Sequence, residues 1–219
     1  MKEIFEGVFR EGKNLHTSNL VPGKRVYGEK LLKLKDNEYR EWVPERSKLA
    51  AAILNGLKEL PIRKGSKILY LGASTGTTPS HVSDIIGKDG IIYGIEFAER
   101  VFRNLLELAK DRKNIAPILA DARKPDGYSW AEECDVVYCD IADPQETEIA
   151  ILNAKEFLKE GGYVLVAVKS QSIDVTKAPQ QVYKEESEKL KKAGFSVLQV
   201  IDLEPYEHKH CLLVAKKPS

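Results

Sequence analysis

The sequence predicts an α/β fold: a seven-stranded mixed sheet preceded by a small antiparallel β domain. Short apolar pieces broken by turn residues fill the first 45 residues, which is typical of antiparallel strands. From Lys67 onward, strand-like runs alternate with helical patterns, as in a parallel sheet covered on both faces. Only Glu204-Pro205-Tyr206-Glu207 separates the last two strand-like runs, which is too short for a parallel crossover. The final strand is therefore expected to run antiparallel to the others.

The N-terminal residues are expected to form a small antiparallel meander as a domain of their own. Turn chemistry at Glu11-Gly12-Lys13, Pro22-Gly23 and Asp36-Asn37 separates its strands. The boundary is expected after residue 45, which gives a small β domain at 1–45 and an α/β domain at 46–219. The strand-like pieces are Ile4-Phe5, Val8-Phe9, Val26-Tyr27 and Leu31 to Leu34.

The α/β part is expected to open with a helix, because the apolar period changes after residue 45. Leu49, Ile53, Leu57 and Leu60 recur at the spacing of one helix face, and Pro61 and Gly65 follow them. The expected helix therefore extends to Leu60. Further helical stripes carry Val101, Leu105 and Leu108, and then Ile149, Leu152 and Leu158. The seven strand-like runs begin near Ile68, Ile91, Ile115, Val136, Tyr163, Val197 and Leu212.

Composition excludes several classes of protein. The 219 residues contain no long apolar run and begin with no signal peptide, so neither a membrane span nor secretion is expected. Three cysteines, two of them in strand-like runs, indicate buried thiols in a reducing cytoplasm and no metal site. Lys and Arg total 34 against 33 Asp and Glu, which is too balanced for a strong stand-alone nucleic-acid binder.

A glycine-rich loop and three acids are predicted to share one rim of the sheet. Ligands of such folds bind beyond the carboxyl ends of the strands. The first strand of the α/β part leads into the loop Leu71 to Thr78, and the next three lead into Glu96, Asp121 and Asp140. Together with the reversed last strand, this combination predicts a Rossmann-like class I methyltransferase that binds S-adenosylmethionine.

Each of these residues has an expected role at the cofactor. Gly72 and Gly76 let the backbone approach a ligand, and Thr77 or Thr78 caps the helix that follows. Glu96 lies 20 residues after Gly76, at the distance where an acid meets ribose hydroxyls. Asp121 could accept a hydrogen bond from the adenine amine.

Two other readings of the loop remain open. The dinucleotide-binding motif of an oxidoreductase is Gly-x-Gly-x-x-Gly. Here Ser74 occupies the middle glycine position, and Gly76 is out of register. That reading also leaves Asp140 unexplained. The third interpretation is a Rossmann-like domain whose ligand site is inactive or of a different kind.

Five motifs are spread along the chain. They are Arg46-Ser47-Lys48-Leu49-Ala50-Ala51-Ala52-Ile53, Tyr70-Leu71-Gly72-Ala73-Ser74-Thr75-Gly76-Thr77-Thr78, Asp140-Ile141-Ala142-Asp143-Pro144, Val168-Lys169-Ser170-Gln171-Ser172-Ile173-Asp174 and Leu203-Glu204-Pro205-Tyr206-Glu207. In this order they resemble the fibrillarin family, and the resemblance covers nearly the whole chain. The chain has no Gly/Arg-rich N-terminal segment, so it is similar to the archaeal form of the family.

The resemblance implies an S-adenosylmethionine-dependent ribose 2′-O-methyltransferase of ribosomal and transfer RNA. It implies the catalytic subunit of the box C/D ribonucleoprotein, in which a guide RNA selects the target RNA. The implied protein partners are a Nop-domain scaffold protein and a kink-turn-binding protein. The implied catalytic residues are Lys48, Asp140, Lys169 and His210. The implied cofactor-binding residues are Gly72, Ala73, Ser74, Thr77, Thr78, Glu96, Phe97, Asp121, Ala122, Asp140 and Gln145.

The residue types suit this chemistry. Because a sulfonium is already a good leaving group, catalysis needs positioning and removal of a proton from a ribose hydroxyl. Lys169, at the end of a strand, is the candidate base, and Lys48 is a second charge that could hold the target nucleotide. Asp140 would orient Lys169 or the substrate, and as an anion it opposes loss of the lysine proton. His210 could bind the ribose or shuttle the proton.

Alternatives remain at the level of single residues and of function. Lys48 could be a solvated helix lysine, and Asp140 a helix cap. His208 and His210 without further ligands rarely make a metal site. The chain could instead be a stand-alone class I methyltransferase of another RNA or of a small molecule, or a non-catalytic scaffold. Balanced charge suits a subunit whose guide complex supplies most phosphate binding, with Arg123 or Lys177 touching RNA.

Overall fold

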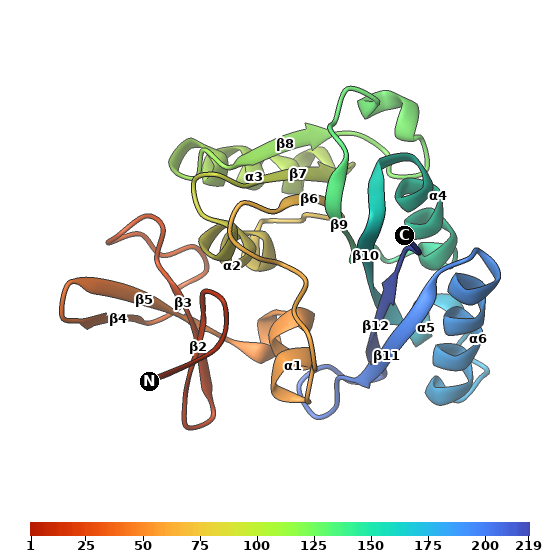
Figure 1. Cartoon of the computed structure of the whole chain (residues 1–219), viewed down its shortest axis with the longest axis horizontal. Coiled ribbons are helices and arrows are strands. Elements are labelled where there is room, and N and C mark those ends of the chain that lie inside the picture. Colours follow the sequence, from red (N-terminus) through yellow and green to blue (C-terminus); the bar gives the residue numbers. More distant parts are fainter.

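The computed structural model describes residues 1–219 and contains two sheets. The N-terminal sheet has five antiparallel strands in the order β1-β2-β3-β5-β4. Figure 1 shows it beside α1 and α2, on the opposite side of the large sheet from α4 and α6. Its strands are β1 (Lys2–Phe5), β2 (Val8–Glu11), β3 (Asn14–Ser18), β4 (Leu31–Leu34) and β5 (Asn37–Trp42).

The prediction for this sheet was right in class and wrong in detail. Asn14–Ser18 forms a central strand that the sequence analysis did not single out, and β5 pairs with it, so the order is not a simple meander. The predicted piece Val26-Tyr27 is not a strand, because the backbone N–H groups of both residues donate to the Glu29 carboxylate. A local carboxylate thus replaces the expected partner strand.

The large sheet confirms the predicted seven-stranded mixed arrangement. Its order is β11-β12-β10-β9-β6-β7-β8, and β12 alone runs antiparallel to both of its neighbours. The short turn before β12 explains that reversal. The strands are β6 (Lys67–Leu71), β7 (Ile91–Glu96), β8 (Ile115–Leu119), β9 (Cys134–Cys139), β10 (Leu158–Lys169), β11 (Ser196–Asp202) and β12 (His210–Lys216).

Helices cover both faces of this sheet. One buried cluster contains residues of α1, α2 and α3, and the other contains residues of α4 and α6. Successive strand residues alternate between the clusters, so Ile68 and Tyr70 face one side while Leu69 and Leu71 face the other. The helices are α1 (Lys48–Leu54), α2 (Thr77–Ile86), α3 (Glu99–Asp111), α4 (Glu146–Phe157), α5 (Ser170–Ile173) and α6 (Pro179–Lys192), with short 3₁₀ helices at Pro44–Arg46 and Pro125–Tyr128.

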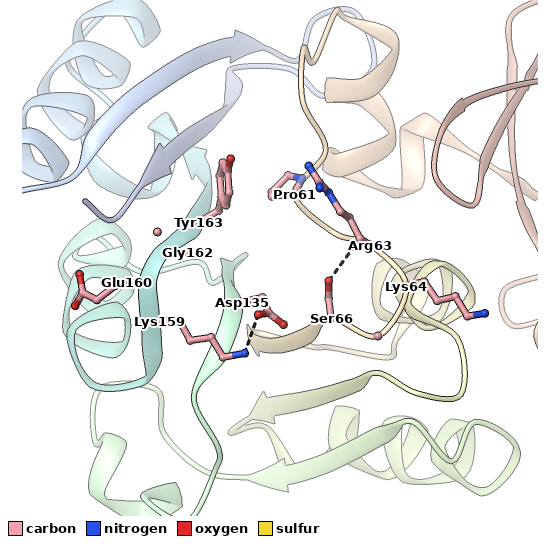
Figure 2. A pocket seen from close by; sticks show the side chains of 11 residues that line it. Pro61, Arg63, Lys64, Ser66, Asp135, Lys159, Glu160, Gly162 and Tyr163 are labelled. Atoms are coloured by element: carbon pink, nitrogen blue, oxygen red, sulfur yellow. Dashed lines mark hydrogen bonds and ion pairs between the residues drawn. The ribbon is translucent and has the colours of Figure 1, made fainter. Parts of the chain in front are cut away.

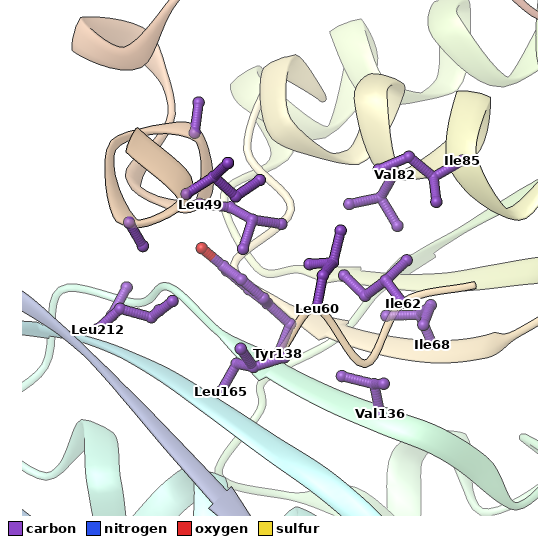
Figure 3. Close-up of a cluster of buried hydrophobic side chains, with 14 of the residues drawn as sticks. Leu49, Leu60, Ile62, Ile68, Val82, Ile85, Val136, Tyr138, Leu165 and Leu212 are labelled. Carbon is purple, nitrogen blue, oxygen red and sulfur yellow. The ribbon is translucent and has the colours of Figure 1, made fainter. Parts of the chain in front are cut away.

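The first cluster joins the two sheets. It includes Val8, Leu15 and Trp42 of the N-terminal sheet together with residues of α1, α2 and the large sheet. In Figure 3, Leu49 of α1 and Val82 of α2 face Tyr138 and its neighbours on the strands. The division of the chain into domains after residue 45 stays a prediction.

A buried ion-pair network also connects the N-terminal sheet to α2. Arg40 on β5 contacts Glu29 at 2.7 Å and Asp84 of α2 at 2.8 Å, with all three side chains buried. Arg112 contacts the same Asp84 at 2.6 Å. Each buried carboxylate therefore has a cationic partner, which buried charges require.

The first helix ends earlier than predicted. α1 stops at Leu54, because Gly56 adopts a positive φ of 93° and the Asn55 side chain donates to the carbonyls of Asp202 and Glu204. Leu57 and Leu60 are still buried, although they belong to no helix. Their helical spacing reflects burial of the connecting segment, so the predicted extension to Leu60 was wrong.

The predicted helix cap by a threonine was also wrong. The N-cap of α2 is Gly76, at a φ of 88°, and it makes no side-chain cap. A β-carbon at Gly76 would lie 2.2 Å from the Leu108 side chain, so packing against α3 requires glycine there. Gly87 ends the helix at its C-cap.

The three cysteines are free and buried, as the sequence analysis expected of their thiols. No helix combines the length and the apolar character that crossing a membrane requires.

Candidate active site

Three of the predicted catalytic side chains meet at the carboxyl ends of β9 and β10. The Asp140 carboxylate lies 2.7 Å from Lys169 Nζ and 3.2 Å from Lys48 Nζ. Lys169 Nζ also donates to the Ile141 carbonyl at 2.6 Å. Ser47 caps α1, so Lys48 enters the site from the first residue of a capped helix. One carboxylate therefore holds two ammonium groups that lie 121 residues apart in the sequence.

The electrostatics of this cluster follow from the shared carboxylate. Burial raises the pKa of Asp140, but the charges of Lys169 and Lys48 lower it by a larger amount. The pKa of Asp140 therefore lies below its usual value. Burial lowers the pKa of Lys48, but the Asp140 carboxylate more than offsets this effect and the pKa lies above its usual value. Asp140 is thus an anion and Lys48 a cation at neutral pH.

His210 enters the same corner from the reversed strand. It is the direct cross-strand partner of Lys169 in the β10–β12 pair. Its Nδ1 lies 3.3 Å from the Glu207 carboxylate without hydrogen-bond geometry, and its side chain is 23% exposed. His210 is therefore close to Lys169 and reachable by a substrate.

The glycine-rich loop passes directly beneath Asp140. Gly72 has a φ of 80°, and a β-carbon there would lie 2.7 Å from the Asp140 carbonyl oxygen. Ser74, at a φ of 51°, donates its N–H to the Glu96 carboxylate at 2.9 Å. The other Glu96 oxygen accepts from the Ala98 N–H at 2.9 Å. Glu96 thus fixes the loop and keeps lone pairs that ribose hydroxyls could use.

Two adjoining cavities follow this rim. The first, about 250 Å³, runs from Gly72 and Ser74 past Glu96 to Asp140. The second, about 140 Å³, lies toward Asp121, and the two share Phe97, Ala122, Ile141 and Ala142 as walls. Phe97 is 72% exposed, although it is a large apolar side chain. A long ligand with a charged end and an apolar aromatic end suits this pair of cavities.

Four predicted cofactor residues do not line either cavity. Ala73 is buried beneath the loop, and Gln145 is exposed at the N-cap of α4. Thr77 begins α2, and the Thr78 hydroxyl donates to Ser47 at 3.0 Å. Their roles in cofactor binding stay predictions.

Asp121 lies at the far end of the rim, where Arg123 occupies its carboxylate. Three contacts of 2.9 to 3.2 Å join the Arg123 guanidinium to Asp121. Arg123 also lies 3.9 Å from Asp143 across the second cavity. An adenine amine at Asp121 would share the carboxylate with this guanidinium.

A larger cavity, of about 450 Å³, lies elsewhere and has no part in this geometry. Figure 2 shows its lining, which includes Arg63, Ser66 and the ion pair of Lys159 with Asp135 at 2.9 Å. Ser66 precedes β6 and Asp135 is near the start of β9, so this cavity lies at the amino ends of the strands. A strand of five residues separates it from the Asp140 cluster by roughly 15 Å.

The structure adds one charged residue that the sequence analysis missed. Glu146 is fully buried behind Lys169, and its carboxylate accepts from the Lys169 backbone N–H at 2.8 Å. An acid in the first turn of a helix is common, so its position in the sequence gave no signal. No group of three or more His, Cys, Asp and Glu side chains is arranged to hold a metal ion.

Comparison with known proteins supplies the family. The sequence profile described as Fibrillarin matches residues 1–219. The chain is 53% identical to a fibrillarin-like rRNA/tRNA 2′-O-methyltransferase of Methanopyrus kandleri, covering 98% of this chain and 95% of the relative.

Two solved structures share the whole architecture. Aeropyrum pernix fibrillarin, in complex with natively bound S-adenosyl-L-methionine, is 46% identical with a TM-score of 0.87 and covers 98% of this chain and all of its own. The fibrillarin of a fibrillarin/Nop5p complex is 41% identical with a TM-score of 0.88, covering 99% of this chain and all of its own. The resemblance inferred from the five motifs is confirmed, and the chain belongs to the fibrillarin family.

Proposed function

We propose that this chain is an S-adenosylmethionine-dependent ribose 2′-O-methyltransferase of ribosomal and transfer RNA. One observation carries the proposal: Asp140 holds Lys48 and Lys169 at the end of the cavity that the glycine-rich loop borders. The name of the Methanopyrus kandleri relative states the same reaction and the same RNA classes.

The rim suits S-adenosylmethionine. Gly72 lines the cavity, and a β-carbon there would collide with the Asp140 carbonyl, so only glycine lets the loop pass this close to Asp140. Glu96 lines the first cavity and would bind the ribose hydroxyls, and Asp121 lines the second and would bind the adenine amine beside the apolar wall of Phe97. When bound, this cofactor supplies a methyl group on a sulfonium leaving group.

The catalytic residues act on the ribose hydroxyl. Lys169, in its amine form, takes the proton from O2′ as the bond from oxygen to the methyl carbon forms and the bond from that carbon to sulfur breaks. Lys48 stays charged and holds the nucleotide, while Asp140 fixes both lysines in place. His210, across from Lys169, binds the ribose or carries the proton onward.

The target RNA arrives through a ribonucleoprotein. The fibrillarin of the fibrillarin/Nop5p complex is 41% identical to this chain, which supports a Nop-domain scaffold protein as partner. A box C/D guide RNA selects the target, and a kink-turn-binding protein anchors that RNA. A net charge of +1 is consistent with partners that supply most of the phosphate binding. The assembly is expected in the cytoplasm, whose reducing conditions suit three buried free thiols.

Reconstitution tests the proposal. The chain is assembled with a Nop-domain scaffold, a kink-turn-binding protein and a guide RNA, and the labelled product is mapped for ribose against base methylation. We expect guide-dependent 2′-O-methylation, little activity from the chain alone, and loss of methylation with Lys169→Ala. Base methylation, or full activity of Lys169→Ala, would contradict the proposal, and the second result would favour another base.

A further inference from the structure

Glu146 places a buried carboxyl directly behind the candidate base. It is the first residue of α4, and its side chain is completely inaccessible to solvent. Oε1 accepts the Lys169 backbone N–H at 2.8 Å. Oε2 lies 3.9 Å from Lys169 Nζ and has no hydrogen-bond partner. A buried carboxyl oxygen without a partner is costly, so this arrangement calls for an explanation.

The surroundings of this carboxyl favour its neutral form. Burial raises the pKa of Glu146 to about 8, although the charge and the N–H of Lys169 oppose the rise. Asp140 and Glu186 repel a negative charge on Glu146. The titratable and charged groups that face it from the surrounding elements are Lys48 on α1, Cys139 and Asp140 at the end of β9, Lys169 on β10, Glu186 on α6 and Cys211 on β12.

We propose that Glu146 is a positioning residue for Lys169, with one oxygen fixing the backbone at the end of β10 and the other facing the side-chain nitrogen from inside the core. This inference rests on the proposed methyl transfer. Lys169 is then held from two sides, because Asp140 and the Ile141 carbonyl contact its Nζ from the rim. The Lys169 side chain is still 14% exposed, so a substrate can reach it.

The protonation state of Glu146 connects positioning to the reaction rate. A neutral carboxyl adds no charge near Nζ, so Lys169 can lose its proton to become a base. An ionised carboxylate 3.9 Å away would stabilise the ammonium form instead. The methylation rate should therefore level off with rising pH as Glu146 ionises.

Two substitutions separate the contact of Glu146 with the Lys169 backbone from the effect of its ionisation. Glu146→Gln keeps an oxygen for the Lys169 N–H but cannot ionise, whereas Glu146→Leu removes the oxygen while keeping similar volume. Single-turnover methylation is measured with the full reconstituted complex, alongside S-adenosylmethionine affinity from calorimetry. Thr147→Val is the matched control, because Thr147 lies on the same turn, is buried and has an unpartnered hydroxyl.

The expected results are specific. Glu146→Leu should slow methyl transfer about 100-fold, the cost of a small misplacement of a reacting group, with unchanged cofactor affinity. Glu146→Gln should react near the wild-type rate at pH 7, and its rate should keep rising through pH 8, where the wild type levels off. Thr147→Val should behave as wild type.

Other outcomes would overturn the inference. If Glu146→Leu reacts as fast as wild type, the carboxyl does not position Lys169. If Glu146→Leu fails to fold, the pH profile of Glu146→Gln decides, and levelling at the same pH as wild type refutes the inference. If the wild-type complex does not methylate ribose, the proposed function itself is refuted. If wild type and Glu146→Leu are both active at equal rates, only the inference about Glu146 is refuted.

Discussion

The Thr78 hydroxyl donates a hydrogen bond of 3.0 Å to the Ser47 hydroxyl. Thr78 belongs to the first turn of α2, directly after the glycine-rich loop, and Ser47 caps α1 immediately before Lys48. This buried contact joins the helix that follows the glycine-rich loop to the helix that carries Lys48, a candidate catalytic residue.

Substitution of either hydroxyl tests this connection. Ser47→Ala removes both the helix cap and the contact, so we expect about 1 kcal/mol lower stability together with slower methylation. Thr78→Val removes only the contact and keeps the cap, so it should retain stability better while slowing methylation by a similar factor. Denaturant unfolding and single-turnover rates measure the two effects. Equal rates for Thr78→Val and wild type would show that the contact is structural only.

Gly72→Ala is expected to weaken cofactor binding. The new β-carbon would lie 2.7 Å from the Asp140 carbonyl at a φ of 80°, so the loop must move away from the position that borders the cavity. We expect affinity for S-adenosylmethionine to fall at least about tenfold by calorimetry. Gly127→Ala is the control, because a β-carbon there meets nothing within 4 Å. Unchanged affinity for Gly72→Ala would place the cofactor elsewhere.

Glu146 should make stability depend on pH. In the unfolded chain its carboxyl ionises near the ordinary value of 4.5, whereas burial raises its pKa to about 8 in the folded protein. The unfolded state therefore releases a proton that the folded state keeps, and this group destabilises the fold increasingly between pH 4.5 and pH 8.

Chemical unfolding at several pH values checks this expectation. Glu146→Gln should gain stability relative to wild type as pH rises across that window, with a constant difference above pH 8 and a different constant value below pH 4.5. Parallel stability curves for the two proteins would show that the carboxyl is not held neutral.

The Arg40 network predicts a large loss of stability on substitution. Arg40→Leu would leave the buried Glu29 carboxylate without its guanidinium and would leave Asp84 with Arg112 alone. Removing one partner of a buried ion pair typically costs roughly 3–5 kcal/mol, which thermal or denaturant unfolding would reveal. Arg10→Leu, at an exposed position on β2, should change stability little. A loss below 1 kcal/mol for Arg40→Leu would contradict this view.

The sequence predicted those features that follow from local pattern. Alternation of strands and helices gave the sheet, and the short turn near Pro205 gave its reversed strand, because neither depends on distant contacts. Tertiary contacts decided the rest. The Asn55 side chain ends α1 by bonding to carbonyls of residues 202 and 204, and packing against Leu108 requires glycine at position 76.

The candidate site likewise contains residues that the sequence marks and residues that only tertiary contacts reveal. Lys48, Asp140 and Lys169 were singled out because family motifs and strand ends mark them. Glu146 was not, because a first-turn acid is ordinary until its burial is known. The Arg123 contact with Asp121 likewise arises from side-chain geometry that no spacing reveals.

The place of β12 has a consequence for how the site is assembled during folding. This strand lies between β10 and β11, both of which precede it in the sequence, and it brings His210 opposite Lys169. A folding intermediate in which β12 has not yet entered that gap would lack the histidine and would leave the Lys169 strand unpaired on one edge. Methylation activity should therefore appear only once β12 has entered the sheet, and the amide protons of β12 should become protected from exchange as activity is gained.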